Sequence, residues 1–296
     1  MKLYMKSLMT VATFILIFVQ TSCKKETSTQ SLQASEEEMR AISEENASAD
    51  AEYDEVTEIA MTAAADLQVA TSEAGFSSAE IRAGFRIRTH IFHQLFGKLG
   101  PCTEITESSE TFPKTITINY GEGCKCRDGK FRKGIVILNF TNPLHTPGAV
   151  LTINLKDYYV NRAHIEGTKI ITNLSTAGSH KFSISINKGK INWSNGRGFT
   201  YEGSRIFTQV QGIETSTVND DVYEIEGQSK TIYANGIIVV KKTTSPLIRK
   251  LSCAWVVQGI VQIAINDRIL FLDFGNGDCD NKAILSWSGG TQEITL

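Results

Sequence analysis

The chain lacks a surplus of basic residues: 30 lysines and arginines stand against 32 aspartates and glutamates in 296 residues. The formal charge of −2 and an isoelectric point near 6.2 leave no excess positive charge to neutralise a phosphate backbone. We therefore expect no nucleic-acid partner. A mean hydropathy of −0.12 also excludes a protein built from many membrane-spanning helices.

The sequence also lacks the short motifs of several enzyme classes. It contains no G-x-S-x-G, no H-E-x-x-H, no G-x-x-x-x-G-K-[ST] and no G-x-G-x-x-G that opens a helix. Hydrolase, protease and nucleotide chemistry therefore have no support from motifs, and we expect a non-enzymatic protein without a cofactor.

The first 22 residues have the composition of an export signal. Lys2 and Lys6 give a basic start, and residues 8–19 form an apolar run. This run is shorter than the roughly 20 residues that cross a bilayer. We therefore interpret residues 1–22 as a signal peptide and not as a spanning helix.

The end of this segment resembles a bacterial lipoprotein precursor, in which a small residue precedes the cysteine that receives the lipid. Ser22 followed by Cys23 fits this pattern, although Gln20 stands where an aliphatic residue is usual. The resemblance implies lipidation at Cys23 and anchoring in the outer membrane, on its periplasmic or cell-surface face. The alternative is ordinary cleavage that leaves Cys23 as a free thiol.

A tether and a helical segment follow the anchor. Residues 23–35 are rich in Ser, Thr and Gln and indicate a flexible tether. Residues 36–98 are predicted to hold one or two amphipathic helices, since Ser35 and Glu38 have capping-box spacing and apolar residues recur every three or four positions up to residue 74. Ten carboxylates lie between Glu36 and Glu58, and they indicate a solvated helix face or, alternatively, an acidic docking surface.

Residues 99–296 have the alternation of antiparallel β structure. Short runs rich in Ile, Val, Thr, Phe and Tyr are separated by Gly, Asn and Asp, which supply the positive φ angles of tight turns. The sequence predicts a mainly β fold: a long antiparallel meander of roughly twelve to fourteen strands that forms a curved sheet, a sandwich or an open barrel.

Two parts of this β region are similar to each other. A cysteine, a strand, a Gly-x-Gly turn and a second cysteine occur between Cys102 and Cys124, and again between Cys253 and Cys279. Residues 113–137 (PKTITINYGEGCKCRDGKFRKGIVI) and 272–285 (LDFGNGDCDNKAIL) also resemble a group of uncharacterised lipoproteins of the Bacteroidota. That resemblance, with its DFGxGxC-type turns, implies a fold and a cellular location but no activity.

The cysteine count favours two disulfides. With Cys23 lipidated, five cysteines remain in an exported protein. The spacings favour Cys102 with Cys124 and Cys253 with Cys279, which leaves Cys126 as the free thiol. Pairing of Cys102 with Cys126 is the alternative. A metal held by the C-x-C pair is disfavoured, because no second Cys/His pair follows at finger spacing.

One loop offers a candidate cation site. Asn276, Asp278 and Asp280 present alternate oxygen side chains, the ligand type that Ca²⁺ prefers, although a turn between strands selects the same residues. His90 and His93 are the only clustered histidines, and without a third ligand we interpret them as half-exposed surface residues.

Two further sets of residues bear on function. The mid-sheet acids that could serve a carbohydrate-active hydrolase are Glu166, Asp220, Asp221 and Glu226, provided that two of them face each other across a cleft. The aromatic residues that could hold a sugar or a lipid are Trp193, Phe199, Tyr201, Trp255 and Trp287, and we expect most of these to lie in the core.

The hypothesis that best fits the sequence is a lipid-anchored protein of the cell envelope with a non-enzymatic binding or structural role. Its partners would be the membrane, through the N-terminal lipid, and a glycan, a lipid or an envelope protein as ligand. The alternatives are a carbohydrate-active hydrolase, and a lipid-binding carrier whose barrel encloses an unfilled apolar cavity.

Overall fold

A computed structural model describes residues 36–72, 92–214, 220–253 and 255–296. The predicted signal peptide (residues 1–22), the lipidation site Cys23 and the tether (residues 23–35) lie outside the described residues, as does His90. Residues 34–296 form one compact unit.

The helical segment begins with α1 (Glu36–Ser72), a single helix of 37 residues. Its described buried side chains recur at spacings near three and four and face the sheet: Ile42, Ala49, Tyr53, Val56, Ile59, Ala60, Ala63 and Leu67. No glycine or proline interrupts this stretch, so the apolar stripe stays continuous from Ile42 to Leu67. Neither described helix is long and apolar enough to cross a membrane.

A second, short helix is held by the first. The described part of α3 (His93–Leu99) starts where the backbone N–H groups of Gln94 and Leu95 donate to the carboxylate of Asp66 on α1, at 3.2 and 2.9 Å. A carboxylate at a helix N-terminus satisfies N–H groups that have no partner within the helix. Asp66 is buried, and burial is the main reason that its pKa is raised.

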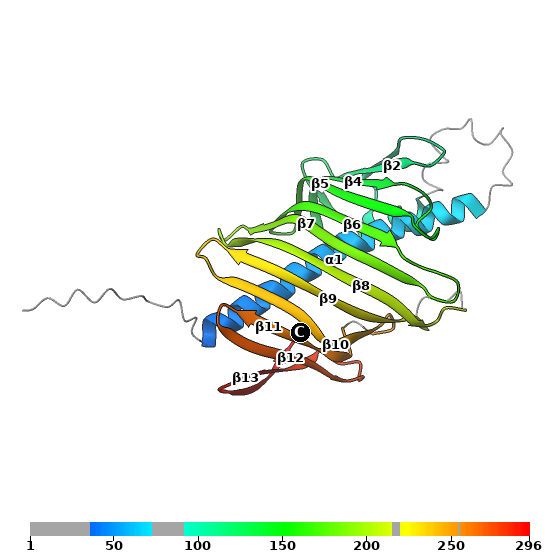
Figure 1. Cartoon of the computed structure of the whole chain (residues 1–296). Coiled ribbons are helices and arrows are strands. Elements are labelled where there is room, and N and C mark those ends of the chain that lie inside the picture. The colour runs from blue at the N-terminus through cyan, green and yellow to red at the C-terminus, as the bar shows by residue number, and fades with distance from the viewer. Residues whose placement is uncertain (1–35, 73–91, 215–219, 254) are drawn as a thin grey trace, which may run out of the picture. The chain divides into compact units, whose positions relative to one another are not determined.

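All fourteen strands belong to one antiparallel sheet (Figure 1). They are β1 (Glu104–Glu107), β2 (Lys114–Asn119), β3 (Cys124–Lys125), β4 (Phe131–Phe140), β5 (Val150–Val160), β6 (Ala163–Asn173), β7 (Lys181–Trp193), β8 (Gly198–Gln211), β9 (Val222–Tyr233), β10 (Ile238–Lys250), β11 (Gln258–Ile265), β12 (Arg268–Asn276), β13 (Lys282–Trp287) and β14 (Gly290–Thr295). Their spatial order follows the chain from β1 to β14, except that β3 pairs only with β4.

The mainly β meander predicted from the sequence is therefore confirmed. Of the three architectures that the sequence left open, the structure has the single open sheet, with β1 and β14 as its edges. The strands of the described residues all join this sheet, which does not close into a barrel. Short hairpin connections explain this result, since apart from β2, which pairs with β4, each strand pairs with the next one along the chain.

The helix lies obliquely across one face of the sheet (Figure 1) and supplies the core of that face. Alternation puts Ile118, Val136 and other aliphatic residues of neighbouring strands on the helix side. On the opposite face polar residues lie side by side, as where Thr115 donates a hydrogen bond to Asn139 at 2.9 Å. Below, these are called the helix face and the outer face.

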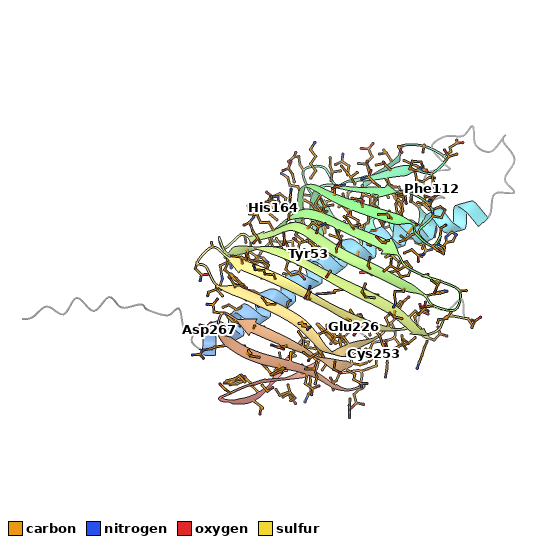
Figure 2. The ribbon with its side chains drawn as sticks, viewed as in Figure 1. Tyr53, Phe112, His164, Glu226, Cys253 and Asp267 are labelled. Atoms are coloured by element: carbon orange, nitrogen blue, oxygen red, sulfur yellow. A yellow bond between two sulfur atoms is a disulfide. The ribbon has the colours of Figure 1, made fainter. Side chains whose placement is uncertain are left out.

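A break in the pairing of β6 with β7 makes room for the helix. The register shifts between Glu166 and Thr168, where Gly167 has a φ of +122°. A Cβ on Gly167 would lie 2.8 Å from the Cα of Gly189 on β7, and one on Gly189 would lie 2.6 Å from the hydroxyl oxygen of Tyr53. Only glycine fits this close approach of two strands and a helix, which places Tyr53 near the middle of the sheet (Figure 2).

Two disulfides join equivalent positions in the two similar units. Cys102–Cys124 connects the residues that flank the β1–β2 hairpin, and Cys253–Cys279 does the same for the β11–β12 hairpin. Cys126 is a free, buried cysteine. The structure therefore has the pairing that the spacing favours. Each loop closure contributes about 3 kcal/mol in the chain-entropy estimate.

Candidate functional site

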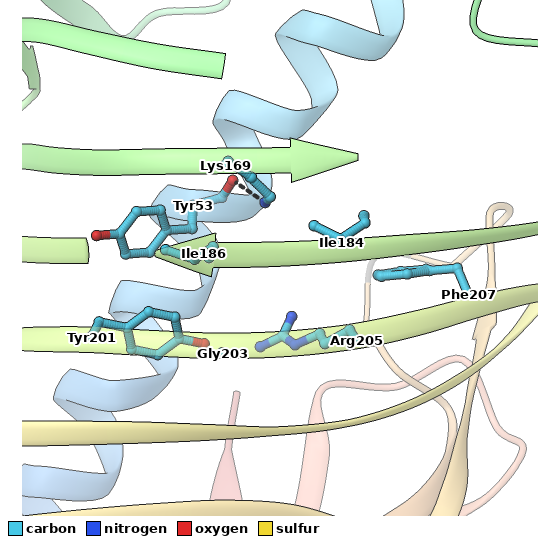
Figure 3. Close-up of a pocket in the computed structure, with 8 residues that line it drawn as sticks. All are labelled: Tyr53, Lys169, Ile184, Ile186, Tyr201, Gly203, Arg205 and Phe207. Carbon is cyan, nitrogen blue, oxygen red and sulfur yellow. Dashed lines mark hydrogen bonds between the residues drawn. The ribbon is translucent and has the colours of Figure 1, made fainter. Parts of the chain in front are cut away.

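A small recess opens on the helix face beside the middle of α1 (Figure 3). It is lined by Tyr53, Lys169, Ile184, Ile186, Tyr201, Gly203, Arg205 and Phe207. Its volume is about 10 Å³, which is enough for about one water molecule. The recess is thus a preformed notch at the border of the helix and not an enclosed cavity for a large ligand.

Two stacked tyrosines form one wall of the recess. The rings of Tyr53 and Tyr201 have centroids 5.2 Å apart, and both side chains are buried. The Tyr53 hydroxyl donates to the backbone carbonyl of Glu166 at 2.9 Å. Burial raises the pKa of Tyr53 far above its ordinary value, so this phenol is a fixed donor and not an acid at neutral pH.

Positive charge borders these rings. The ammonium group of Lys169 donates to the backbone carbonyl of Tyr53 at 2.8 Å, and the Lys241 ammonium lies 5.9 Å from the centroid of Tyr201. Arg205 lies two strand positions from Gly203 in the recess (Figure 3). None of the eight lining residues is acidic. Cationic side chains therefore pack against both members of the tyrosine pair.

An apolar strip extends from the recess along the helix face, beyond the edge of α1. Phe207 pairs with Ile225 on β9, which in turn pairs with Leu247 on β10, so all three side chains share one face. Ile184 and Phe182 continue the strip on β7. Phe207, Leu247 and Ile184 are only half-buried because the helix crosses the sheet obliquely and does not cover this end of the strands.

A second cluster, also near the middle of α1, binds the helix to the sheet. The buried guanidinium of Arg132 on β4 forms ion pairs with Glu55 of α1 and with Asp128, and Lys130 also pairs with Glu55. Arg132 and Glu55 are both buried, and the ion pair is the compensation that buried charges require. Glu52 lies one turn before Glu55, and burial followed by the charge of Glu55 raises its pKa to about 7.

The free thiol lies next to this ionic cluster. The sulfur of Cys126 is 3.8 Å from that of Cys124, and Cys126 is buried. Tyr120 is also buried there, with the Arg132 guanidinium carbon 6.0 Å from its ring centroid. Burial raises the pKa of the Tyr120 phenol well above its ordinary value. These buried side chains have a structural role, since they pack β3 and β4 against the helix.

In the structure, the loop predicted to bind a cation is a turn between two strands. Asn276, Asp278 and Asp280 are exposed, and the Asp280 carboxylate accepts the backbone N–H of Lys282 at 3.0 Å. Within the described ranges, no three His, Cys, Asp or Glu side chains come together in a geometry that could hold a metal ion. Calcium binding stays a prediction without support from this geometry. His93 is exposed at the start of α3.

The mid-sheet acids lie apart from one another, except for the chain neighbours Asp220 and Asp221. Glu166 on β6 pairs loosely with Lys190 and His164, at 3.5 and 3.6 Å, whereas Glu226 is exposed on β9. Three strand spacings separate β6 from β9, about 14 Å, which exceeds the separation of catalytic carboxylate pairs. His164 and Glu226 lie toward opposite ends of the strands (Figure 2).

Asp221 has a structural role. It accepts hydrogen bonds from the side-chain amide of Gln209 at 2.8 Å and from the Tyr223 hydroxyl at 3.4 Å. Burial is the first cause of its raised pKa, followed by the charge of Asp220. The structure thus gives the hydrolase alternative no facing pair among these four acids.

The aromatic residues lie mostly in the core, as expected. Phe199 and Tyr201 are buried, and Trp193 and Trp287 pack against the core from partly buried positions. Trp255 is the exception, with 42% of its surface exposed. Tyr201 is the one member of this predicted set that lines the recess.

Sequence reasoning missed the charged residues of both clusters. Lys169 and Arg132 occupy buried strand positions, where aliphatic residues are the rule. The available signal for Lys169 was that it is in phase with the buried residues Ile165 and Ile171 of the same strand.

Comparison with family models, with curated proteins and with solved structures found no match, so the function must be inferred from the site itself.

Proposed function

We propose that this chain is an exported, lipid-anchored envelope protein that binds a ligand non-enzymatically on the helix face of its sheet. The observation that carries the proposal is the recess beside α1, where cations and stacked tyrosines meet a half-buried apolar strip. Such a mixture of apolar wall and a few placed polar groups is typical of small-molecule binding sites.

The proposals of a lipid anchor and of an envelope location rest on other features. The basic start, the short apolar run and Cys23 support export and lipidation. Two disulfides support folding in an oxidising compartment. Thirteen residues from Cys23 to Ser35 would then separate the lipid from the start of α1.

Metabolic labelling tests the anchor. Cells that express the full chain are grown with an alkyne-tagged palmitate, and the protein is compared with its Cys23→Ser variant. We expect label on the wild-type chain and its recovery in the membrane fraction, and no label on the variant. Cys126→Ser is the matched control and should keep the label. An unlabelled wild-type chain in the soluble fraction would contradict lipidation.

A further inference from the structure

We infer that Cys102, Cys124 and Cys126 form a thiol–disulfide exchange site, in which Cys126 replaces Cys102 in the disulfide and Cys102 becomes available to a low-molecular-weight disulfide. The inference goes beyond the proposed ligand-binding function, and it depends neither on the recess nor on the lipid anchor. It assigns Cys102 as the residue that is modified, although Cys126 is the free cysteine in the structure.

The positions of the sulfur atoms select the reaction. Cys124 and Cys126 stand on either side of the exposed Lys125, so both side chains lie on the same, buried side of the chain. The Cys126 sulfur is 3.8 Å from the Cys124 sulfur, and Cys124 is bonded to Cys102. Exchange proceeds by attack of a thiolate on a disulfide sulfur, and a thiol that contacts such a sulfur is placed to begin it.

The exchange conserves electrons and protons. Cys126 loses its proton and attacks the Cys124 sulfur, the bond from Cys124 to Cys102 breaks, and its electron pair leaves with the Cys102 sulfur, which takes up a proton. One disulfide and one thiol are present before and after this step. Cys102 then attacks a low-molecular-weight disulfide: a mixed disulfide forms on Cys102, and the proton of Cys102 passes to the thiol that is released.

Burial determines which cysteine a reagent in solution can reach. Cys124 and Cys126 are 2% and 4% exposed, whereas Cys102 is exposed, with its sulfur 3.6 Å from the backbone carbonyl oxygen of Lys125. The buried thiol is therefore protected from the reagent and the exposed sulfur is not. Exchange moves the free thiol from the first position to the second.

The geometry of the chain also sets the direction of the exchange. Two residues of a strand span about 6.6 Å, which is near the upper end of the roughly 4.4 to 6.8 Å that separates the Cα atoms of bonded cysteines. A disulfide between Cys124 and Cys126 is thus possible but less favourable than Cys102–Cys124, whose Cα atoms are 5.6 Å apart. The exchanged form accumulates when a reagent captures Cys102.

The second of the two similar units provides an internal control. Its disulfide, Cys253–Cys279, joins equivalent positions, but Asn281 stands where the first unit has Cys126. The second unit therefore lacks the attacking thiol, and its disulfide should stay intact under conditions in which the first one exchanges.

Peptide mapping of residues 24–296, exported from cells so that both disulfides form, tests the inference. The folded protein is incubated with iodoacetamide without reductant, and remaining thiols are blocked with N-ethylmaleimide in denaturant at mildly acidic pH. Trypsin then places the three cysteines in separate peptides, residues 99–114, 115–125 and 126–127. We expect the acetamide label on Cys102 to increase with time, together with a disulfide that joins 115–125 to 126–127. Cys253 and Cys279 should stay joined and unlabelled.

Cys126→Ser removes the attacking thiol and should abolish the label on Cys102, while the intact Cys253–Cys279 disulfide and an unchanged circular dichroism spectrum show that the variant folds. Oxidised glutathione in place of iodoacetamide should give glutathione on Cys102 of the wild-type chain and none on the variant. Label on Cys102 that persists in Cys126→Ser would overturn the inference, as would label confined to Cys126 or absent from all three cysteines. Label on Cys124, with 99–114 joined to 126–127, would place the attack on the other sulfur and would also overturn it.

Discussion

Removal of the Arg132 guanidinium should destabilise the protein strongly, because it leaves an uncompensated charge between α1 and the sheet. The Arg132 side chain is 0% exposed and that of its partner Glu55 is 3% exposed. Loss of one partner of a buried ion pair costs about 3 to 5 kcal/mol. Lys130 also pairs with Glu55 from a half-exposed position, so we place Arg132→Met near 3 kcal/mol.

Urea unfolding followed by far-ultraviolet circular dichroism measures this free energy. The neighbouring residue provides the control, since Lys133 forms an ion pair with the exposed Glu122. Such a surface pair contributes little, and Lys133→Met should leave the unfolding curve unchanged within error. A double variant, Arg132→Met with Glu55→Met, should cost less than the two single changes together. Equal midpoints for Arg132→Met and Lys133→Met would refute the reasoning that this cluster holds the helix.

Three further changes test other parts of the fold. Glu52→Gln should stabilise the protein at pH 8 by about 1 to 2 kcal/mol, after allowance for partial exposure, and should have no effect at pH 4. The pKa of Glu52 is about 7 in the folded state against an ordinary 4.5, so folding stability is lost as the pH rises through that interval. Chemical denaturation at both pH values checks this, and an equal effect at both would disprove it. Replacement of both Cys253 and Cys279 by Ser should cost about 3 kcal/mol in the same assay, and no loss would show that the reduced loop is already constrained. Gly189→Ala should cost about 1 to 3 kcal/mol, since the new Cβ would lie 2.5 Å from the carbonyl of Tyr201, and an unchanged melting temperature would contradict the close approach of helix and sheet.

Local patterns were sufficient to predict the mainly β meander, although they did not decide among a curved sheet, a sandwich and an open barrel. Alternating residues and Asn-Gly turns indicated hairpins, and a chain of hairpins gives a meander in which each strand pairs with the next. Cysteine spacing favoured the two disulfides that flank equivalent hairpins. The amphipathic periodicity from Glu36 onward indicated helix, and Ile42, Tyr53 and Val56 from that pattern are indeed buried.

The site could not be predicted in the same way, because it depends on register between distant segments. Tyr53 and Lys169 are more than a hundred residues apart, and they meet where the register of β6 and β7 shifts beside Gly167. No local pattern pairs Glu55 with Arg132 either. The loop of Asn276 to Asp280 carried the strongest local signal for a site, yet Asp280 accepts a backbone N–H within its own turn.

A methyl-resolved NMR titration of residues 34–296 tests the proposed binding face most directly, with dodecanoate as a probe of the apolar strip. The helix face offers Ile184 and Ile186 at the recess, and the outer face offers Ile232 and Ile269, which are 40% and 51% exposed. We predict saturable shifts of the Ile184 and Ile186 methyl groups, with those of Ile232 and Ile269 unchanged. Shifts confined to the outer-face isoleucines, or none at either face, would contradict a ligand site beside α1.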